Sequence, residues 1–80
     1  MQHELRVKST VIDWPEQAMT ITTTSGEKHT ISLETTITVT MLGYPARETK
    51  TMHAHDLNPY MMRGYIIEQI AFEEGEGQHE

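Results

Sequence analysis

Apolar and polar residues alternate along residues 29–42. The odd-numbered positions carry Ile31, Leu33, Ile37, Val39 and Met41, and the even-numbered positions from 30 to 40 carry hydroxyl or charged side chains. A period of two is typical of a β-strand with one buried face and one face in water. The longest alternating segment of the chain therefore predicts a β-rich core.

Two earlier segments, residues 4–12 and 18–24, alternate in the same way. One face of these segments carries Leu5, Val7, Val11, Met19, Ile21 and Thr23. Ser9 interrupts the apolar face of the first segment. Turns are expected at residues 13–16, where Pro15 lacks a backbone donor, and at residues 25–28. Together with residues 29–42, these segments predict an antiparallel meander.

The alternation also constrains the turns. Directly opposed residues share a face, so Ile21 must lie opposite an odd-numbered residue such as Ile31 or Leu33. This requires an odd number of loop residues, and we expect a turn of three or five residues in which Gly26 supplies a positive φ. The same parity is expected across the turn at Trp14.

Residues 29–42 are too long for one straight strand. At about 3.3 Å per residue, fourteen residues reach roughly 46 Å, whereas a chain of this size folds to a diameter of roughly 30 Å. We expect a bend or bulge at Thr35 and Thr36, where the apolar face carries a hydroxyl. The alternative is a long arm that pairs with a second subunit.

The second half of the chain gives weaker patterns. Residues 47–55 alternate weakly and carry many charges, which predicts an edge strand. Asn58 as N-cap and Pro59 at the first position predict a short helix over residues 59–63 that ends at Gly64. Residues 65–72 would then form a central final strand. A continuous helix over residues 59–74 is the alternative.

These expectations define the fold class. We predict a mainly β, β-rich α+β domain, an antiparallel meander sheet or small open barrel of about five strands with one short helix near residues 59–63. The formal net charge is −6, and residues 68–80 hold five Glu with no Lys or Arg, so the rest of the chain is nearly neutral. Residues 1–73 are expected to form a single domain, and residues 74–80 an acidic, disordered tail.

Composition sets the expected location. No apolar run approaches the roughly 20 residues needed to span a bilayer, and the first residues lack the apolar stretch of a signal peptide. The chain contains no cysteine. We expect a cytosolic protein without membrane contact.

The best candidate for metal chemistry is the pair His53 and His55. Residues two apart on a strand point to the same side, so two imidazoles could share a transition metal. Asp56, or His3, His29 and His79 from elsewhere, could add ligands. A solvated edge strand explains the pair without a metal, and no cofactor is required.

Other chemistry finds little support. There is no cysteine, no recognisable Ser–His–acid arrangement and no Gly-rich phosphate loop, so we expect no enzyme activity. Nucleic-acid binding is disfavoured because the body of the chain lacks a clear positive charge.

One group of side chains suggests a protein contact. Met adapts to irregular surfaces and aromatic residues anchor interfaces. The candidates are Trp14, Tyr44, Tyr60, Met61 and Met62, although core packing would also explain most of them. The sequence predicts a small non-enzymatic interaction module, an adaptor, inhibitor or assembly subunit that binds a protein partner through an exposed strand edge and this patch, or forms a homodimer. The alternative is a metal-dependent small-molecule binding domain that uses His53 and His55.

Overall fold

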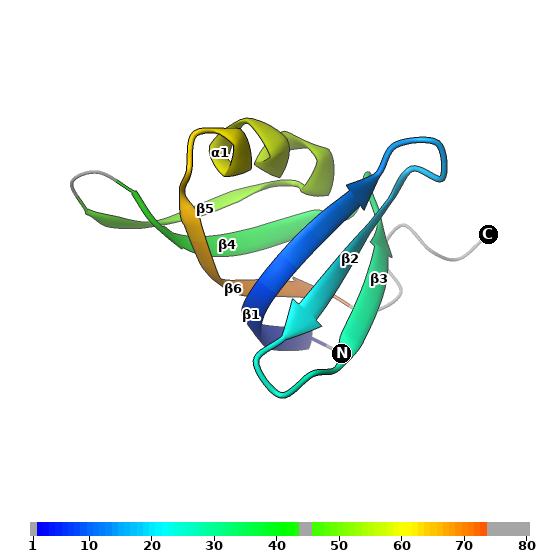
Figure 1. Cartoon of the computed structure of the whole chain (residues 1–80), viewed down its shortest axis with the longest axis horizontal. Helices are drawn as coiled ribbons and strands as arrows, with labels where there is room; N and C mark the ends of the chain where they lie inside the picture. The colour runs from blue at the N-terminus through cyan, green and yellow to red at the C-terminus, as the bar shows by residue number, and fades with distance from the viewer. Residues whose placement is uncertain (1, 44–45, 74–80) are drawn as a thin grey trace.

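The computed structural model describes residues 2–43 and 46–73, which form one open antiparallel sheet with a short helical segment (Figure 1). The elements are β1 (Gln2–Asp13), β2 (Ala18–Thr23), β3 (Lys28–Ser32), β4 (Thr36–Leu42), β5 (Arg47–His53), the 3-10 helix η1 (Ala54–Leu57), α1 (Asn58–Met62) and β6 (Ile66–Glu73). The mainly β fold class is confirmed. The sheet has six strands because the long alternating segment forms two of them.

The strand order is β3-β2-β1-β6-β4-β5, and β1 joins the two halves of the sheet. Its first residues pair with β6, and residues 7–13 pair with β2 on the other side. Figure 1 shows that β1, β2 and β3 run across the direction of β4 and β6, so the sheet folds over on itself. Fully buried side chains between the two halves include Met19, Ile21, Ile37, Val39, Met41 and Ile70.

A bulge at Lys8 lets β1 change partners. Val7 lies opposite Thr23, but Ser9 lies opposite Thr22, so Lys8 is an extra residue on β1. Beyond this bulge, the side chains that face the core are on even-numbered positions. Ile12 packs against the core, and Val11 is 63% exposed.

Two sequence predictions for β1 are therefore wrong. Val11 does not share the apolar face of Leu5 and Val7, because the bulge turns the second half of the strand over. The turn at Trp14 does not keep the odd parity either. Asp13 lies opposite Ala18, which leaves four loop residues. Asp13 Oδ1 accepts a hydrogen bond from the Glu16 N–H (3.2 Å) in this turn.

The turn between β2 and β3 confirms the odd-parity prediction. The Thr23 N–H donates to Glu27 O (2.8 Å), so three residues, 24–26, form the loop. Gly26 has a φ of +97°, which glycine adopts without a steric penalty. Ile21 lies opposite the odd-numbered His29, and Ile31 lies opposite Met19.

The predicted bend near Thr35 is also confirmed. β3 ends at Ser32 and β4 begins at Thr36, and the Thr35 N–H donates to Ser32 O (3.0 Å) in the turn between them. Leu33 and Thr35 stay buried through the turn. The alternating pattern continues across the bend because β3 and β4 both turn their odd-numbered side chains toward the core.

The second half of the chain follows the predicted arrangement, with two corrections. The strand expected over residues 47–55 ends at His53, because residues 54–57 form η1. β5 is an edge strand and β6 is central. Because residues 66–73 form β6, the alternative of a continuous helix over residues 59–74 is wrong. Asn58 is the first residue of α1 and not its N-cap, because η1 leads directly into α1. Gly64, with a φ of +90°, follows the helix as expected.

Tyr44 and the tail at residues 74–80 lie outside the described residues. Within the described ranges, no helix is long and apolar enough to cross a membrane.

Candidate functional site

The edge formed by β5 carries backbone groups that no neighbouring strand takes up. The Gly43 N–H donates to Ala46 O (3.1 Å) and the Ala54 N–H donates to Thr35 O (2.9 Å), one at each end of the β4–β5 ladder. Hydrogen-bonded and non-hydrogen-bonded pairs alternate along an antiparallel ladder. The N–H and C=O groups that point away from β4 therefore belong to Arg47, Thr49 and Thr51. His53 adds its N–H, because its C=O begins the hydrogen bonding of η1.

The opposite edge, β3, offers less. Hydrogen bonds from the Thr23 N–H to Glu27 O and from the Leu33 N–H to Gln17 O lie at the two ends of the β2–β3 ladder. By the same alternation, the backbone groups that point away from β2 belong to Lys28, Thr30 and Ser32. The Ser32 carbonyl already accepts the Thr35 N–H. β3 has five residues and β5 has seven. β5 is thus the longer of the two edges and the one with more free backbone groups.

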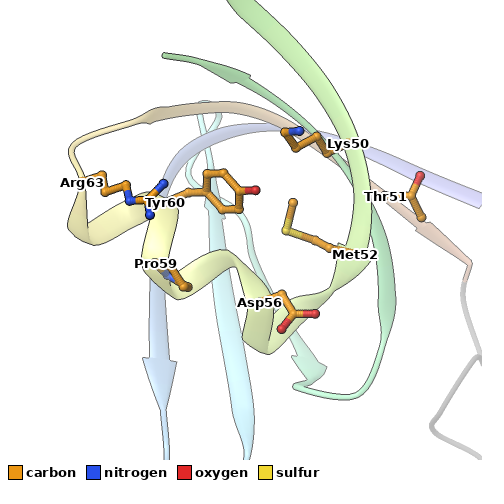
Figure 2. Close-up of a pocket in the computed structure, with 7 residues that line it drawn as sticks. All are labelled: Lys50, Thr51, Met52, Asp56, Pro59, Tyr60 and Arg63. Carbon is orange, nitrogen blue, oxygen red and sulfur yellow. The ribbon is translucent and has the colours of Figure 1, made fainter. Parts of the chain in front are cut away.

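A groove of about 600 Å³ lies between β5 and the helical segment. It is lined by Lys50, Thr51, Met52, Asp56, Pro59, Tyr60 and Arg63. Figure 2 shows Tyr60 between Arg63 and Met52, with Thr51 on the far side of the β5 ribbon. Lys50 and Met52 reach the groove together because side chains two apart on a strand share a face.

Packing behind the groove fixes the Tyr60 ring. It meets the Tyr65 ring edge to face, with 5.3 Å between centroids and 81° between planes. The Tyr65 ring in turn lies against Gly43, where a Cβ would overlap it. Only glycine at position 43 leaves room for this arrangement, so the tyrosine pair supports one wall of the groove.

The charges in the groove are unevenly paired. Lys50 Nζ lies 3.5 Å from Glu48 Oε1 on the same strand. Arg63 forms no ion pair with any described residue. Figure 2 places Arg63 on the side of the helical segment and Lys50 on the side of β5, with Asp56 at the end of the groove away from both. The end of the groove near Arg63 is therefore suited to a negatively charged group.

The structure places the expected contact residues in several environments. Tyr60 lines the groove, whereas Met61 faces β1, where Thr10 Oγ1 donates to its Sδ (2.7 Å). Met62 is 80% exposed. Trp14 is 47% exposed and lies in the β1–β2 turn, which Figure 1 shows apart from α1. Tyr44 is outside the described residues. Of the expected contact residues, only Tyr60 lines the groove, and Met61 and Met62 share α1 with it without forming one patch.

The groove also includes residues that the sequence analysis did not select. Lys50 and Met52 alternate on the inner face of β5, and Arg63 follows Tyr60 by three residues. Both spacings were visible in the sequence. What was missing was the packing of α1 beside β5, which depends on the tertiary structure.

The predicted metal residues lie where β5 passes into η1. His53 is the last residue of β5, and His55 and Asp56 belong to η1. Their ligand atoms all lie within 4.8 Å of one another. His3 instead stacks on Phe72 and lies near His29, with 6.2 Å between the two imidazole centroids.

On the outer face of the sheet, Arg47 pairs with Glu68. Arg47 Nε donates to Glu68 Oε1 (2.7 Å) and Nη2 donates to Oε2 (3.4 Å). This hydrogen bond, together with the attraction of the guanidinium charge, holds the pKa of Glu68 below its ordinary value. The pKa of Arg47 is raised by the same contact.

Comparisons with protein-family models, with curated proteins and with solved structures found no match for this chain.

Proposed function

We propose that this protein is a non-enzymatic interaction module that binds an extended segment of a partner protein. The segment adds to the sheet as a further strand beside β5, and alternate side chains enter the groove next to α1. The observation that carries this proposal is the regular seven-residue edge, with outward backbone groups on Arg47, Thr49, Thr51 and His53.

The groove defines the chemistry of the partner segment. On an added strand, residues opposite Lys50 and Met52 point to the inner face of the sheet and thus to the groove. Met52, Pro59 and Tyr60 offer an apolar surface. Arg63, which has no acidic partner in the described part of the chain, favours a carboxylate beside it. The proposed ligand is an extended peptide with one apolar and one acidic side chain at alternate positions.

The test compares proline substitutions at the two edges. Thr51→Pro removes an N–H that points away from β4, so the native ladder keeps its hydrogen bonds, but the added strand loses a donor and meets the pyrrolidine ring. Thr30→Pro makes the same change on β3. The two variants are matched because each also loses one Thr–Thr contact, Thr51 with Thr38 (3.2 Å) or Thr30 with Thr20 (3.3 Å).

Random-sequence peptides displayed on phage serve as the probe. Peptides enriched on the wild-type protein should bind Thr51→Pro at least about tenfold more weakly, because one main-chain hydrogen bond and close packing are lost. Their affinity for Thr30→Pro should be unchanged. Circular dichroism and urea unfolding check that both variants fold. Equal binding to Thr51→Pro and wild type, or no enrichment at all, would contradict the proposal.

A second copy of the chain is the competing occupant of the same edge. Two β5 strands related by a two-fold axis would give a homodimer. Sedimentation of the wild-type protein and of Thr51→Pro separates the two cases. If the wild type is a dimer and Thr51→Pro is a monomer, the occupant of the β5 edge is a second copy of the chain and not a peptide of another protein. We also propose a cytosolic location, which suits a chain that contains no cysteine for disulfides.

A further inference from the structure

The corner where β5 meets η1 brings three metal-ligating side chains together. We propose that His53, His55 and Asp56 bind one divalent transition-metal ion of the Zn²⁺ class, with a remaining coordination position open to water or to an incoming ligand group. This site adjoins the proposed peptide groove, because Asp56 lines the groove and His53 ends the β5 edge, but the ion would be held by side chains and not by the backbone of that edge. Among the described residues, His53, His55 and Asp56 form a group of three potential metal ligands whose ligand atoms lie within 4.8 Å of one another.

The distances between the ligand atoms suit a small ion. His55 Nδ1 lies 3.1 Å from Asp56 Oδ1, and His53 Nδ1 lies 3.9 Å from Asp56 Oδ2. A tetrahedral Zn²⁺ with ligands at about 2.1 Å separates neighbouring ligand atoms by about 3.4 Å. The two observed distances lie on either side of that value but end on different oxygens of Asp56, so the carboxylate and the imidazoles must shift for one ion to bind all three side chains.

The two imidazoles need to rotate for full coordination. Their rings are stacked, with 5.4 Å between centroids and 12° between planes, whereas two nitrogens on one ion must converge on it. The side chains of His53 and His55 are 52% and 38% exposed. Both side chains are therefore partly exposed, and rotation toward the solvent side can bring their nitrogens closer together.

The backbone beneath the ligands is firmly held. Ala54 and Leu57 are fully buried, so the residues between and after the ligands anchor η1 in the core. The Ala54 N–H donates to Thr35 O (2.9 Å) and the His55 N–H donates to Leu33 O (3.1 Å). Burial of Ala54 directs both histidines outward, and a fixed backbone reduces the entropy lost on metal binding.

The donor set selects the kind of metal. Two imidazoles and one carboxylate suit Zn²⁺ and its neighbours, whereas Mg²⁺ and Ca²⁺ favour sites made only of oxygen ligands. We therefore expect Zn²⁺ to bind and Mg²⁺ not to compete with it.

The test is titration of ZnCl₂ into the untagged chain of 80 residues by calorimetry. The wild-type protein should bind one equivalent. His53→Ala, His55→Ala and Asp56→Asn should each weaken Zn²⁺ binding at least about tenfold. Loss of a residue that only hydrogen-bonds to a metal ligand already weakens binding by about that factor, and loss of the ligand itself should cost more. His29→Ala and His79→Ala are matched controls and should bind as the wild type does. Wild-type affinity in the three ligand variants, or loss of binding in His79→Ala, would overturn the site.

A second measurement separates this site from the proposed peptide function. Zn²⁺ should raise the melting temperature of the wild-type protein and of Thr51→Pro, and leave that of His55→Ala unchanged, since a ligand that binds the folded state stabilises it. Imidazole resonances in a two-dimensional NMR spectrum should shift for His53 and His55 only. Zn²⁺ binding that disappears in Thr51→Pro, or shifts confined to other histidines, would contradict the assignment.

Discussion

Two buried threonines show how one residue type can have opposite effects on stability. Thr23 and Thr35 are 5% and 0% exposed. Thr23 Oγ1 accepts the Glu27 N–H (3.0 Å) and lies 2.9 Å from Ser25 Oγ, whereas Thr35 Oγ1 is buried without a hydrogen-bond partner among the described residues. A buried hydroxyl without a partner destabilises the folded state, because it gives up its hydrogen bonds to water.

The same substitution should therefore change the free energy of unfolding in opposite directions. Thr35→Val keeps the shape of the side chain and removes the unpaired hydroxyl, so it should raise the free energy of unfolding by about 1 kcal/mol. Thr23→Val removes the acceptor of the Glu27 N–H and should lower it by about 1 kcal/mol. Urea unfolding at neutral pH measures both. A lower midpoint for Thr35→Val than for the wild type would show that its hydroxyl is satisfied.

At the scale of single elements, the bulge in β1 decides which side chains meet the core. Lys8 is the extra residue, and it exchanges the roles of odd and even positions after it. Val11 is exposed and Ile12 packs on the core as a result. Simple alternation assigns these two neighbours the other way round.

A pair of threonine substitutions tests this exchange. Val11→Thr should change the free energy of unfolding by less than about 0.5 kcal/mol, because the position is exposed and threonine suits a strand. Ile12→Thr should lower it by about 1–2 kcal/mol, because apolar area leaves the core. Chemical denaturation of both variants gives the comparison. A larger loss from Val11→Thr would place the bulge elsewhere.

The sequence predicted the strands well and the bulge poorly, for a physical reason. Burial on one face imposes a period of two, so the strands, the bend near Thr35 and the turn at Gly26 could be inferred from it. A bulge resets that period at one position. Ser9 marked an irregularity, but Val11 and Ile12 are both apolar, and the sequence alone could not decide which one is buried.

The candidate sites were only partly predictable for a related reason. His53 and His55 were selected because residues two apart on a strand point to the same side, and Asp56 adjoins them in sequence. In the structure His55 lies in η1 and not on the strand. The groove combines Lys50 and Met52 with Tyr60 and Arg63, from two separate elements. Nothing in the local pattern of β5 indicates that α1 packs beside it.

At the scale of the whole molecule, the ion pair between Arg47 and Glu68 connects two strands that are not neighbours. Arg47 begins β5 and Glu68 belongs to β6, and β4 lies between them. The contact lies on the outer face, where the Glu68 side chain is 33% exposed. It therefore makes the stability of the sheet depend on the ionisation of one surface carboxylate.

This dependence has a defined sign. The pKa of Glu68 is lower in the folded state than in the unfolded state, so the pair stabilises the fold above the unfolded pKa, and this effect is lost as the pH falls through the folded pKa. Arg47→Met should unfold at a lower urea concentration than the wild type at neutral pH. The difference should vanish at a pH below the folded pKa of Glu68.

Arg63→Met is the control, because Arg63 has no ion pair within the described ranges. Its difference from the wild type should not change with pH over that interval. NMR titration of the Glu68 carboxyl carbon should show its pKa rising in Arg47→Met. An unchanged Glu68 pKa in that variant would remove Arg47 as the cause.

The central position of β6 also determines the order in which the strands can pair during folding. β1, β2 and β3 pair with near neighbours in sequence, as do β4 and β5, whereas β6 joins β1 and β4, with Gln2 opposite Glu73. Contacts between residues so far apart in the sequence form slowly, since a long loop must close first. During synthesis, the two local hairpin groups emerge before β6 and have no backbone ladder between them. The strand made after both groups is the one that turns them into a single sheet.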